Sequence, residues 1–286
     1  MLALLSFVWG VHWVIVKIGL EYLPPFTYAA LRVASALATT VALLGLQRRL
    51  RLPARDDLPI VLSVGLGQVV AGVLIMNVAL QVVPAGRSSV LYYTMPLWVA
   101  LILAVTYRVW PARFEIVGLV LGIAGIIALL SSTAIDLGAA DELAGTLLLL
   151  TNAVIWAGVT IHIRRHRWVG NPLDLSPWQL LVALVPIVVV AVVLESGQPV
   201  RWELATVLVL LFSGPLATSF ATWASQAITR SLGSQATGTG FLAVPVVGLA
   251  SGAIVLRESL SLVDLLGFGL VLAGIAVTAF GPRSRD

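Results

Sequence analysis

Residues 88–126 read SSVLYYTMPLWVALILAVTYRVWPARFEIVGLVLGIAGI, and residues 237–275 read TGTGFLAVPVVGLASGAIVLRESLSLVDLLGFGLVLAGI. The two stretches align without a gap at a shift of 149 residues, which places Pro96 on Pro245 and Arg108 on Arg257. Shared alanine, leucine or isoleucine means little in so apolar a sequence, whereas paired prolines and arginines rarely arise by chance. The chain therefore contains an internal repeat.

The repeat extends beyond these two stretches. At a shift of 147 residues, Trp9 lies on Trp156 and Lys17 lies on Arg164. We therefore predict two related halves, residues 1–135 and 136–286, that together form one integrated domain.

The composition identifies the solvent of this chain. Of its 286 residues, 59% are apolar and only 10% are charged, against about 25% charged residues in an ordinary soluble domain. A soluble fold of this size could not hide so much apolar surface, so we predict an all-α integral membrane protein in the lipid bilayer. The chain has no cysteine, which excludes disulfides, thiolate metal sites and cysteine nucleophiles. We expect no cofactor.

Apolar runs with charged or turn-rich borders mark the predicted transmembrane helices. The ten predicted spans are residues 2–20, 25–46, 58–82, 88–109, 114–131, 143–163, 177–195, 204–228, 235–256 and 262–280.

The basic residues orient these spans. With the N-terminus inside, the inner connections hold twelve arginines and the outer connections hold three, Arg87, Arg201 and Arg257. Since cytoplasmic connections are rich in Lys and Arg, both termini are predicted to be cytoplasmic. This placement also explains the net charge of +4 without a nucleic-acid partner.

Five spans are an odd number, so the second half must cross the membrane in the opposite sense from the first. Inverted repeats related by an axis in the membrane plane are typical of secondary transporters, in which a midplane site is exposed alternately to the two sides. The fold class is therefore ten transmembrane helices in two inverted five-helix repeats, and it favours a transporter.

Polar and aromatic side chains within the spans indicate a cavity between the halves, because polar groups avoid lipid. In the first span, Trp9, Trp13 and Lys17 share one helical face. Interfacial tryptophans, snorkelling of Lys17 and pairing of Arg32 with backbone carbonyls are the structural alternatives. The predicted substrate-binding residues are Trp9, His12, Trp13, Lys17, Arg32, Gln68, Asn77, Tyr92, Tyr93, Asn152, Trp156, Trp223, Gln226 and Phe241.

Three further patterns bear on mechanism. No Asp or Glu falls in the centre of a predicted span, so facilitated diffusion is favoured, with His12 as the group best suited to proton coupling.

His162 and His166 are spaced as a metal pair but are surrounded by arginines and have no carboxylate near them in sequence, so no metal site is predicted. Gly118-x-x-x-Gly122 predicts close helix contacts, either within one chain or between two, which leaves a monomer or a homodimer open.

Local motifs resemble a known family. Trp9-Gly10, Lys17, Pro25 and Arg32-Val33-Ala34 resemble the opening of EamA-type members of the drug/metabolite transporter superfamily, and Gly118-x-x-x-Gly122-x-x-Gly125 resembles their fifth helix. The resemblance implies ten helices, cytoplasmic termini and movement of metabolites, often outward, across a bacterial inner membrane. The aromatic spans are similar to those of YddG-like amino-acid exporters. Nothing in the seventh span matches Arg32, which departs from a symmetric pattern.

Among substrates, amino acids with aromatic or other apolar side chains fit the predicted cavity best. The alternative is another solute, such as a drug-like compound, a nucleotide precursor or a phosphorylated metabolite. An intramembrane enzyme would need a nucleophile with a base, or a set of metal ligands, near the midplane. No His-Glu-x-x-His, Gly-x-Ser-x-Gly or pair of buried acids is present in the sequence, so we do not predict an enzyme.

Overall fold

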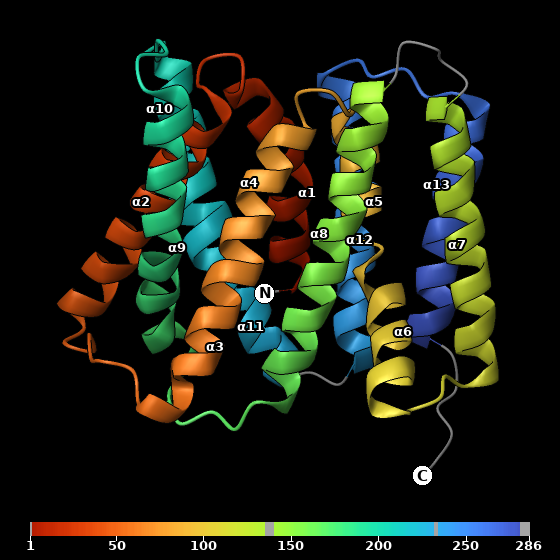
Figure 1. Cartoon of the computed structure of the whole chain (residues 1–286), viewed down its shortest axis with the longest axis horizontal. Coiled ribbons are helices and arrows are strands. Elements are labelled where there is room, and N and C mark those ends of the chain that lie inside the picture. The colour runs from red at the N-terminus through yellow and green to blue at the C-terminus, as the bar shows by residue number, and fades with distance from the viewer. Residues whose placement is uncertain (1, 135–139, 232–233, 281–286) are drawn as a thin grey trace.

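The computed structural model describes residues 2–134, 140–231 and 234–280, and the side chains of residues 2–131, 140–228 and 243–278. The first five spans are helical, with one break inside the fourth (Figure 1). Their elements are α1 (Leu2–Gly19), α2 (Pro25–Leu46), η1 (Arg55–Asp57), α3 (Leu58–Leu62), η2 (Ser63–Val70), α4 (Ala71–Ala79), α5 (Ala85–Tyr92), α6 (Met95–Tyr107) and α7 (Arg113–Ala134).

The other five spans follow the same plan. Their elements are α8 (Ala140–Arg165), α9 (Pro172–Glu195), α10 (Leu204–Leu211), η3 (Phe212–Phe220), α11 (Ala221–Ser231), α12 (Ser234–Val255) and α13 (Leu262–Phe280). Each of the ten predicted spans is confirmed as one helix or a run of consecutive helical elements in the described chain. Eight are long and apolar enough to cross a membrane, and two shorter apolar helices lie at Ala243–Val255 and Leu262–Thr278.

Backbone details repeat at the same spacing as the sequence. The third and eighth spans each contain a π-helical segment, and these segments begin 149 residues apart, at Ser63 and Phe212. Arg108 and Arg257, which the sequence aligns, both adopt a φ of 54° where a helix has ended. One difference is that the fourth span breaks between Tyr92 and Met95, whereas α12 continues through Pro245.

The halves run in opposite senses (Figure 1). In that view α1, α4 and α7 run upward, while their counterparts α8, α11 and α13 run downward. Packing follows this inversion, because α1 packs on α12 while its counterpart α8 packs on α6. The polar spans α1, α2, α4, α8 and η3 therefore gather in the bundle, while α7 and α13 lie as a pair at one edge.

Glycines explain the pairing of α7 with α13. A Cβ atom on Gly118 would lie 2.6 Å from the carbonyl oxygen of Gly274, and one on Gly125 would lie 2.7 Å from that of Gly267. The glycine motif of the fifth span thus forms a contact within the chain, where small residues let two backbones approach closely.

Two carboxylates, Glu195 and Glu258, join the halves at helix starts. Glu195 at the end of α9 accepts hydrogen bonds from the backbone N–H groups of Phe26 and Thr27, at 2.9 and 2.6 Å. Glu258 does the same for Ala85 and Gly86 at the start of α5, at 2.6 and 2.9 Å. Both carboxylates satisfy the unpaired N–H groups of a helix N-terminus that begins after a proline.

Removal of one such charge should measurably weaken the fold. We expect Glu195→Gln to destabilise the protein by about 1 kcal/mol, because a neutral amide interacts less favourably with a helix N-terminus than a carboxylate does. The thermal unfolding midpoint in detergent measures this. Glu21→Gln, at an exposed position, is the matched control, and equal midpoints for the two variants would contradict the assignment.

Candidate functional site

A cavity lies between the halves and encloses about 500 Å³ of space not filled by protein, part of it open to solvent. Side chains from α1, α2, η2, α4, α5, α8, η3 and α11 line it. Eight of the predicted site residues meet there: Trp9, His12, Trp13, Arg32, Gln68, Tyr92, Tyr93 and Trp156.

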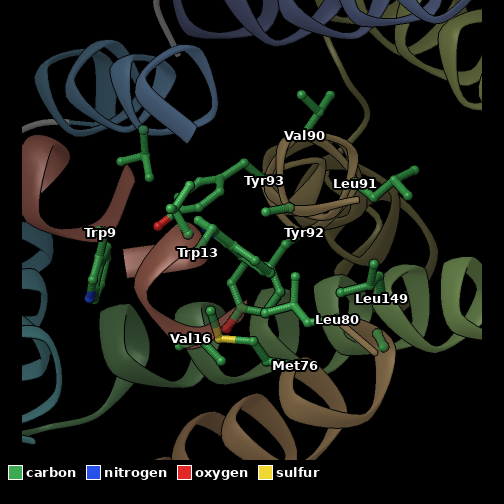
Figure 2. Close-up of a cluster of buried hydrophobic side chains, with 14 of the residues drawn as sticks. Trp9, Trp13, Val16, Met76, Leu80, Val90, Leu91, Tyr92, Tyr93 and Leu149 are labelled. Carbon is green, nitrogen blue, oxygen red and sulfur yellow. The ribbon is translucent and has the colours of Figure 1, made fainter. Parts of the chain in front are cut away.

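Aromatic rings form one wall of the cavity. The ring of Trp156 lies edge-on to Trp9 at 5.6 Å and to Tyr92 at 4.9 Å, measured between ring centroids. Trp13 packs against Tyr92 at 5.3 Å, and Tyr93 lies 5.6 Å from Tyr92 (Figure 2). The Trp9 indole N–H donates to the carbonyl oxygen of Ala217 at 3.0 Å, which fixes the ring orientation. These rings therefore lie inside the bundle and not in an interfacial belt.

Arg32 supplies a buried positive charge. Its side chain lines the cavity and the residue is 6% exposed. The guanidinium Nε donates to Thr218 Oγ1 at 2.7 Å, and a terminal nitrogen lies 3.8 Å from the sulfur of Met76. In the described chain, no carboxylate oxygen lies within 4.0 Å of this guanidinium. Such a charge is costly unless another group pairs with it.

Two neutral groups add unused hydrogen-bonding capacity. His12 is 3% exposed and Gln68 is 7% exposed, and both line the cavity. The His12 Nε2 and Gln68 Oε1 atoms have no hydrogen-bond partner within the described residues. Because buried polar atoms are nearly always paired, these two are available to a bound solute.

Five predicted site residues lie outside the cavity lining. The Asn77 amide donates to the Pro25 carbonyl oxygen at 2.8 Å, and the Asn152 amide donates to that of Gly72 at 3.4 Å. Gln226 exchanges two hydrogen bonds with Gln179, at 3.0 and 3.2 Å. These three amides join helices to one another.

Lys17 and Trp223 complete that group. Lys17, near the end of α1, donates to the Val83 carbonyl oxygen at 3.1 Å and lies 3.8 Å from Glu258. Trp223 packs against Phe220 at 5.8 Å between ring centroids. The side chain of Phe241, the remaining predicted residue, lies outside the described part of the chain.

The lining also includes residues that were not predicted as site residues. Thr218 and Thr222 belong to a polar stripe of the eighth span, and a stripe of this kind is equally compatible with helix packing. The other lining residues carry no sequence signal that separates a cavity wall from a helix contact; they are Val69, Gly72, Val73, Met76 and Ala217. A second, much smaller pocket adjoins the aromatic wall and is lined by Trp9, Tyr92, Tyr93, Met95 and Trp156.

The two neighbouring histidines have partners far away in the sequence. His162 Nδ1 lies 2.8 Å from Ser63 Oγ, and His166 Nε2 lies 3.1 Å from Asp57 Oδ1. The expectation that no carboxylate lies near them is wrong for His166, because the fold brings Asp57 to it from a distant connection. In the described residues, no group of three or more His, Asp or Glu side chains is arranged to hold a metal ion.

Comparisons with known proteins agree with this architecture. The profile of the EamA-like transporter family matches residues 1–131 and again residues 143–280. A Bacillus subtilis protein named "Uncharacterized transporter YoaV" is 27% identical over 281 residues, covering 96% of this chain and 94% of that protein.

An Escherichia coli K12 protein named "Probable amino-acid metabolite efflux pump" is 27% identical and covers 97% of this chain and 93% of its own length. A solved crystal structure has a TM-score of 0.67 at 20% identity and covers 96% of this chain and 94% of its own. That structure therefore shares the fold.

Proposed function

Because the chain belongs to the EamA-like transporter family, we propose that this membrane transporter carries amino acids with aromatic or other apolar side chains through the cavity at Arg32. The observation that carries the proposal is a buried guanidinium with no carboxylate partner among the described residues, in a cavity with a wall of aromatic rings. A carboxylate attached to an apolar group satisfies both features at once.

The carboxylate of the solute would pair with Arg32. Charge-assisted hydrogen bonds from arginine to a carboxylate are shorter and stronger than neutral ones, and the planar guanidinium can bind both oxygens together. Nε is already held by Thr218, so the terminal nitrogens would face the solute. This pairing would remove the cost of leaving Arg32 unpaired.

The rest of an amino acid fits the remaining walls. An apolar or aromatic side chain would pack against Trp9, Tyr92 and Trp156, because aromatic pairs favour edge and offset contacts. Gln68 Oε1 would accept a hydrogen bond from the ammonium group, and His12 Nε2 would do the same in the tautomer that carries the proton on Nδ1. A phosphorylated solute would bring more negative charge than one guanidinium can balance.

No Asp or Glu is among the described lining residues, which favours facilitated diffusion, since proton-coupled carriers commonly use an intramembrane acid. Alternating access would follow from the inverted halves. The arginine-rich connections would place the chain termini in the cytoplasm, and the name of the Escherichia coli relative supports export.

Counterflow into proteoliposomes tests the proposal directly. Liposomes containing purified protein and unlabelled phenylalanine should accumulate external labelled phenylalanine, methionine and threonine, while protein-free liposomes should not. Phenethylamine, which lacks the carboxylate, should compete poorly. Failure of every amino acid to exchange, with a nucleotide precursor or drug-like compound exchanging instead, would overturn the amino-acid assignment.

The aromatic wall should set the affinity for large side chains. We expect Trp9→Ala and Tyr92→Ala to raise the KM for phenylalanine roughly tenfold, since one aromatic contact contributes about 0.5–1.5 kcal/mol beyond area burial. Initial rates of counterflow over a concentration series measure KM. Trp202→Ala is the control, because this tryptophan is 65% exposed, and unchanged KM in folded Trp9→Ala protein would place the site elsewhere.

A further inference from the structure

The repeat-related tryptophans Trp9 and Trp156 touch each other, with ring centroids 5.6 Å apart. Two residues that are exchanged by a two-fold axis can meet only on that axis. The axis relating the inverted halves therefore passes through the aromatic wall, at one side of the cavity.

Close to the axis, both halves contribute equivalent lining residues. At the repeat shift of 149 residues, Gln68 corresponds to Ala217, Val69 to Thr218 and Val73 to Thr222, and all six line the cavity. Both halves therefore build this part of the cavity. Its residues would contact the solute whichever membrane face the cavity opens to.

Farther from the axis, the lining residues that the structure describes come from the first half. Trp13, Arg32 and Met76 line the cavity, and they belong to the part of the bundle where α2 begins and α4 ends, uppermost in Figure 1. The equivalent helices α2 and α9 begin at Pro25 and Pro172, so residues of α2 align with residues of α9 at a shift of 147 residues. Its counterpart is then Gln179.

Those counterparts are not part of this cavity lining. The side-chain amides of Gln179 on α9 and Gln226 on α11 instead exchange two hydrogen bonds with each other. Thr160 and Ser225 are the counterparts of Trp13 and Met76, and the Ser225 hydroxyl donates to the carbonyl oxygen of Thr222 at 2.9 Å. This group lies toward the opposite end of the bundle, where α9 begins and α8 and α11 end.

Additional contacts hold that end shut. The Asp57 carboxylate accepts hydrogen bonds from the backbone N–H groups of Val169 and Gly170, at 3.1 and 2.7 Å. The Trp178 indole donates to the Arg51 carbonyl oxygen at 2.8 Å. The connection between α2 and α3 is thereby tied to the start of α9, beside Gln179.

We infer that Gln179, Gln226, Thr160 and Ser225 form a second half-site, closed in this structure, that opens to the other membrane face and binds the substrate carboxylate through neutral amides. This inference rests on the proposed transport of amino acids. In the opened state Gln179 takes the place that Arg32 has here, and the Gln179–Gln226 pair separates. The shared central residues keep hold of the solute throughout.

The replacement of arginine by glutamine makes the two faces unequal. A charge-assisted hydrogen bond is roughly twice as strong as a neutral one, so the carboxylate binds more weakly in the second half-site. Since the arginine-rich connections mark that end as cytoplasmic, the carrier would bind its substrate more weakly on the inside, where a metabolite for export is abundant.

Cysteine accessibility tests the half-site in a chain that has no cysteine of its own. Single variants Met76→Cys, Ser225→Cys and Gln179→Cys are treated with a membrane-impermeant maleimide in right-side-out and inside-out vesicles. We expect Met76→Cys to react from one face, and Ser225→Cys and Gln179→Cys to react from the other. Ala183→Cys on α9, buried among apolar residues and absent from the cavity lining, should react from neither.

Two results would overturn the inference. One is protection of Ser225→Cys and Gln179→Cys from both faces in protein whose Met76→Cys variant reacts, and the other is reaction of all three from the same face. The labelling pattern does not depend on which solute is carried. If the protein shows the expected labelling pattern but does not exchange amino acids, the second half-site is supported and only the proposed substrate is wrong.

The role of Gln179 in binding has its own measurement. In Gln179→Leu protein, the KM for phenylalanine presented from the face that labels Ser225→Cys should rise about two- to tenfold, while the KM from the other face changes less. Equal increases from both faces would indicate a structural role for the amide and contradict a half-site.

Discussion

Arg32→Gln should lower the apparent affinity for phenylalanine, presented from the face that labels Met76→Cys, by about 10- to 100-fold, because a hydrogen bond to a charged group contributes about 1.5–3 kcal/mol. The variant should fold, since glutamine can still donate to Thr218 and the costly unpaired charge is gone. Counterflow over a substrate concentration series measures the change.

The specificity of the Arg32→Gln variant is more informative than its rate. If Arg32 binds the carboxylate, the variant should lose its discrimination between phenylalanine and phenethylamine. Arg32→Lys should recover part of the affinity, because an ammonium group keeps the charge but cannot bind both carboxylate oxygens in a fork. Arg201→Gln is the matched control, since Arg201 is exposed and pairs with Glu203 at 2.8 Å. Unchanged discrimination in Arg32→Gln would remove Arg32 from the site.

The spans and their inversion could be predicted because the physical requirement is general. Every transmembrane helix needs about 20 apolar residues, and the charged borders of this chain separate those runs clearly. Paired landmarks such as Pro96 and Pro245 then gave the repeat. The π-helical segments at Ser63 and Phe212 could not be predicted, because a change in backbone hydrogen bonding leaves no distinct residue pattern.

Within the site, the aromatic and charged residues were easier to predict than the amides. Trp9, Trp156 and Arg32 are too large or too costly to place in lipid without a reason, so their presence indicates a cavity. Asn77, Asn152 and Gln226 satisfy the same rule by joining helices, and sequence does not distinguish the two uses. Met76 lines the cavity, but an apolar methionine cannot be told from a lipid-facing residue by its residue type.

Long-range partners account for another part of what could not be predicted. Lys17 was placed in the cavity because it shares a helical face with Trp9 and Trp13, yet one further turn brings it to Glu258 and the Val83 carbonyl oxygen. His166 meets Asp57 only because the connection before α3 packs on the start of α9. Helical periodicity gives the face of a residue but not its depth or its neighbours on other helices.

Gly125→Val should prevent the tight pairing of α7 with α13. A Cβ atom on Gly125 would lie 2.7 Å from both the Gly267 carbonyl oxygen and the Val271 backbone nitrogen. Neither backbone atom can move aside without displacing a helix, so we expect the upper part of the range for overpacking, about 3 kcal/mol. The measurement is the thermal midpoint at which the detergent-solubilised protein loses its monodisperse size-exclusion peak.

Gly269→Val on α13 is the matched control for Gly125→Val. It makes the same change in helix propensity, and a Cβ atom there meets no other atom within 4 Å. The control should therefore keep the midpoint of the unsubstituted protein, while Gly125→Val should lower it by several degrees or abolish the peak. Because membrane helices gain no hydrophobic drive for association in lipid, their pairing depends on such close backbone contact. Equal midpoints for the two variants would mean that the α7–α13 contact does not hold this edge of the bundle together.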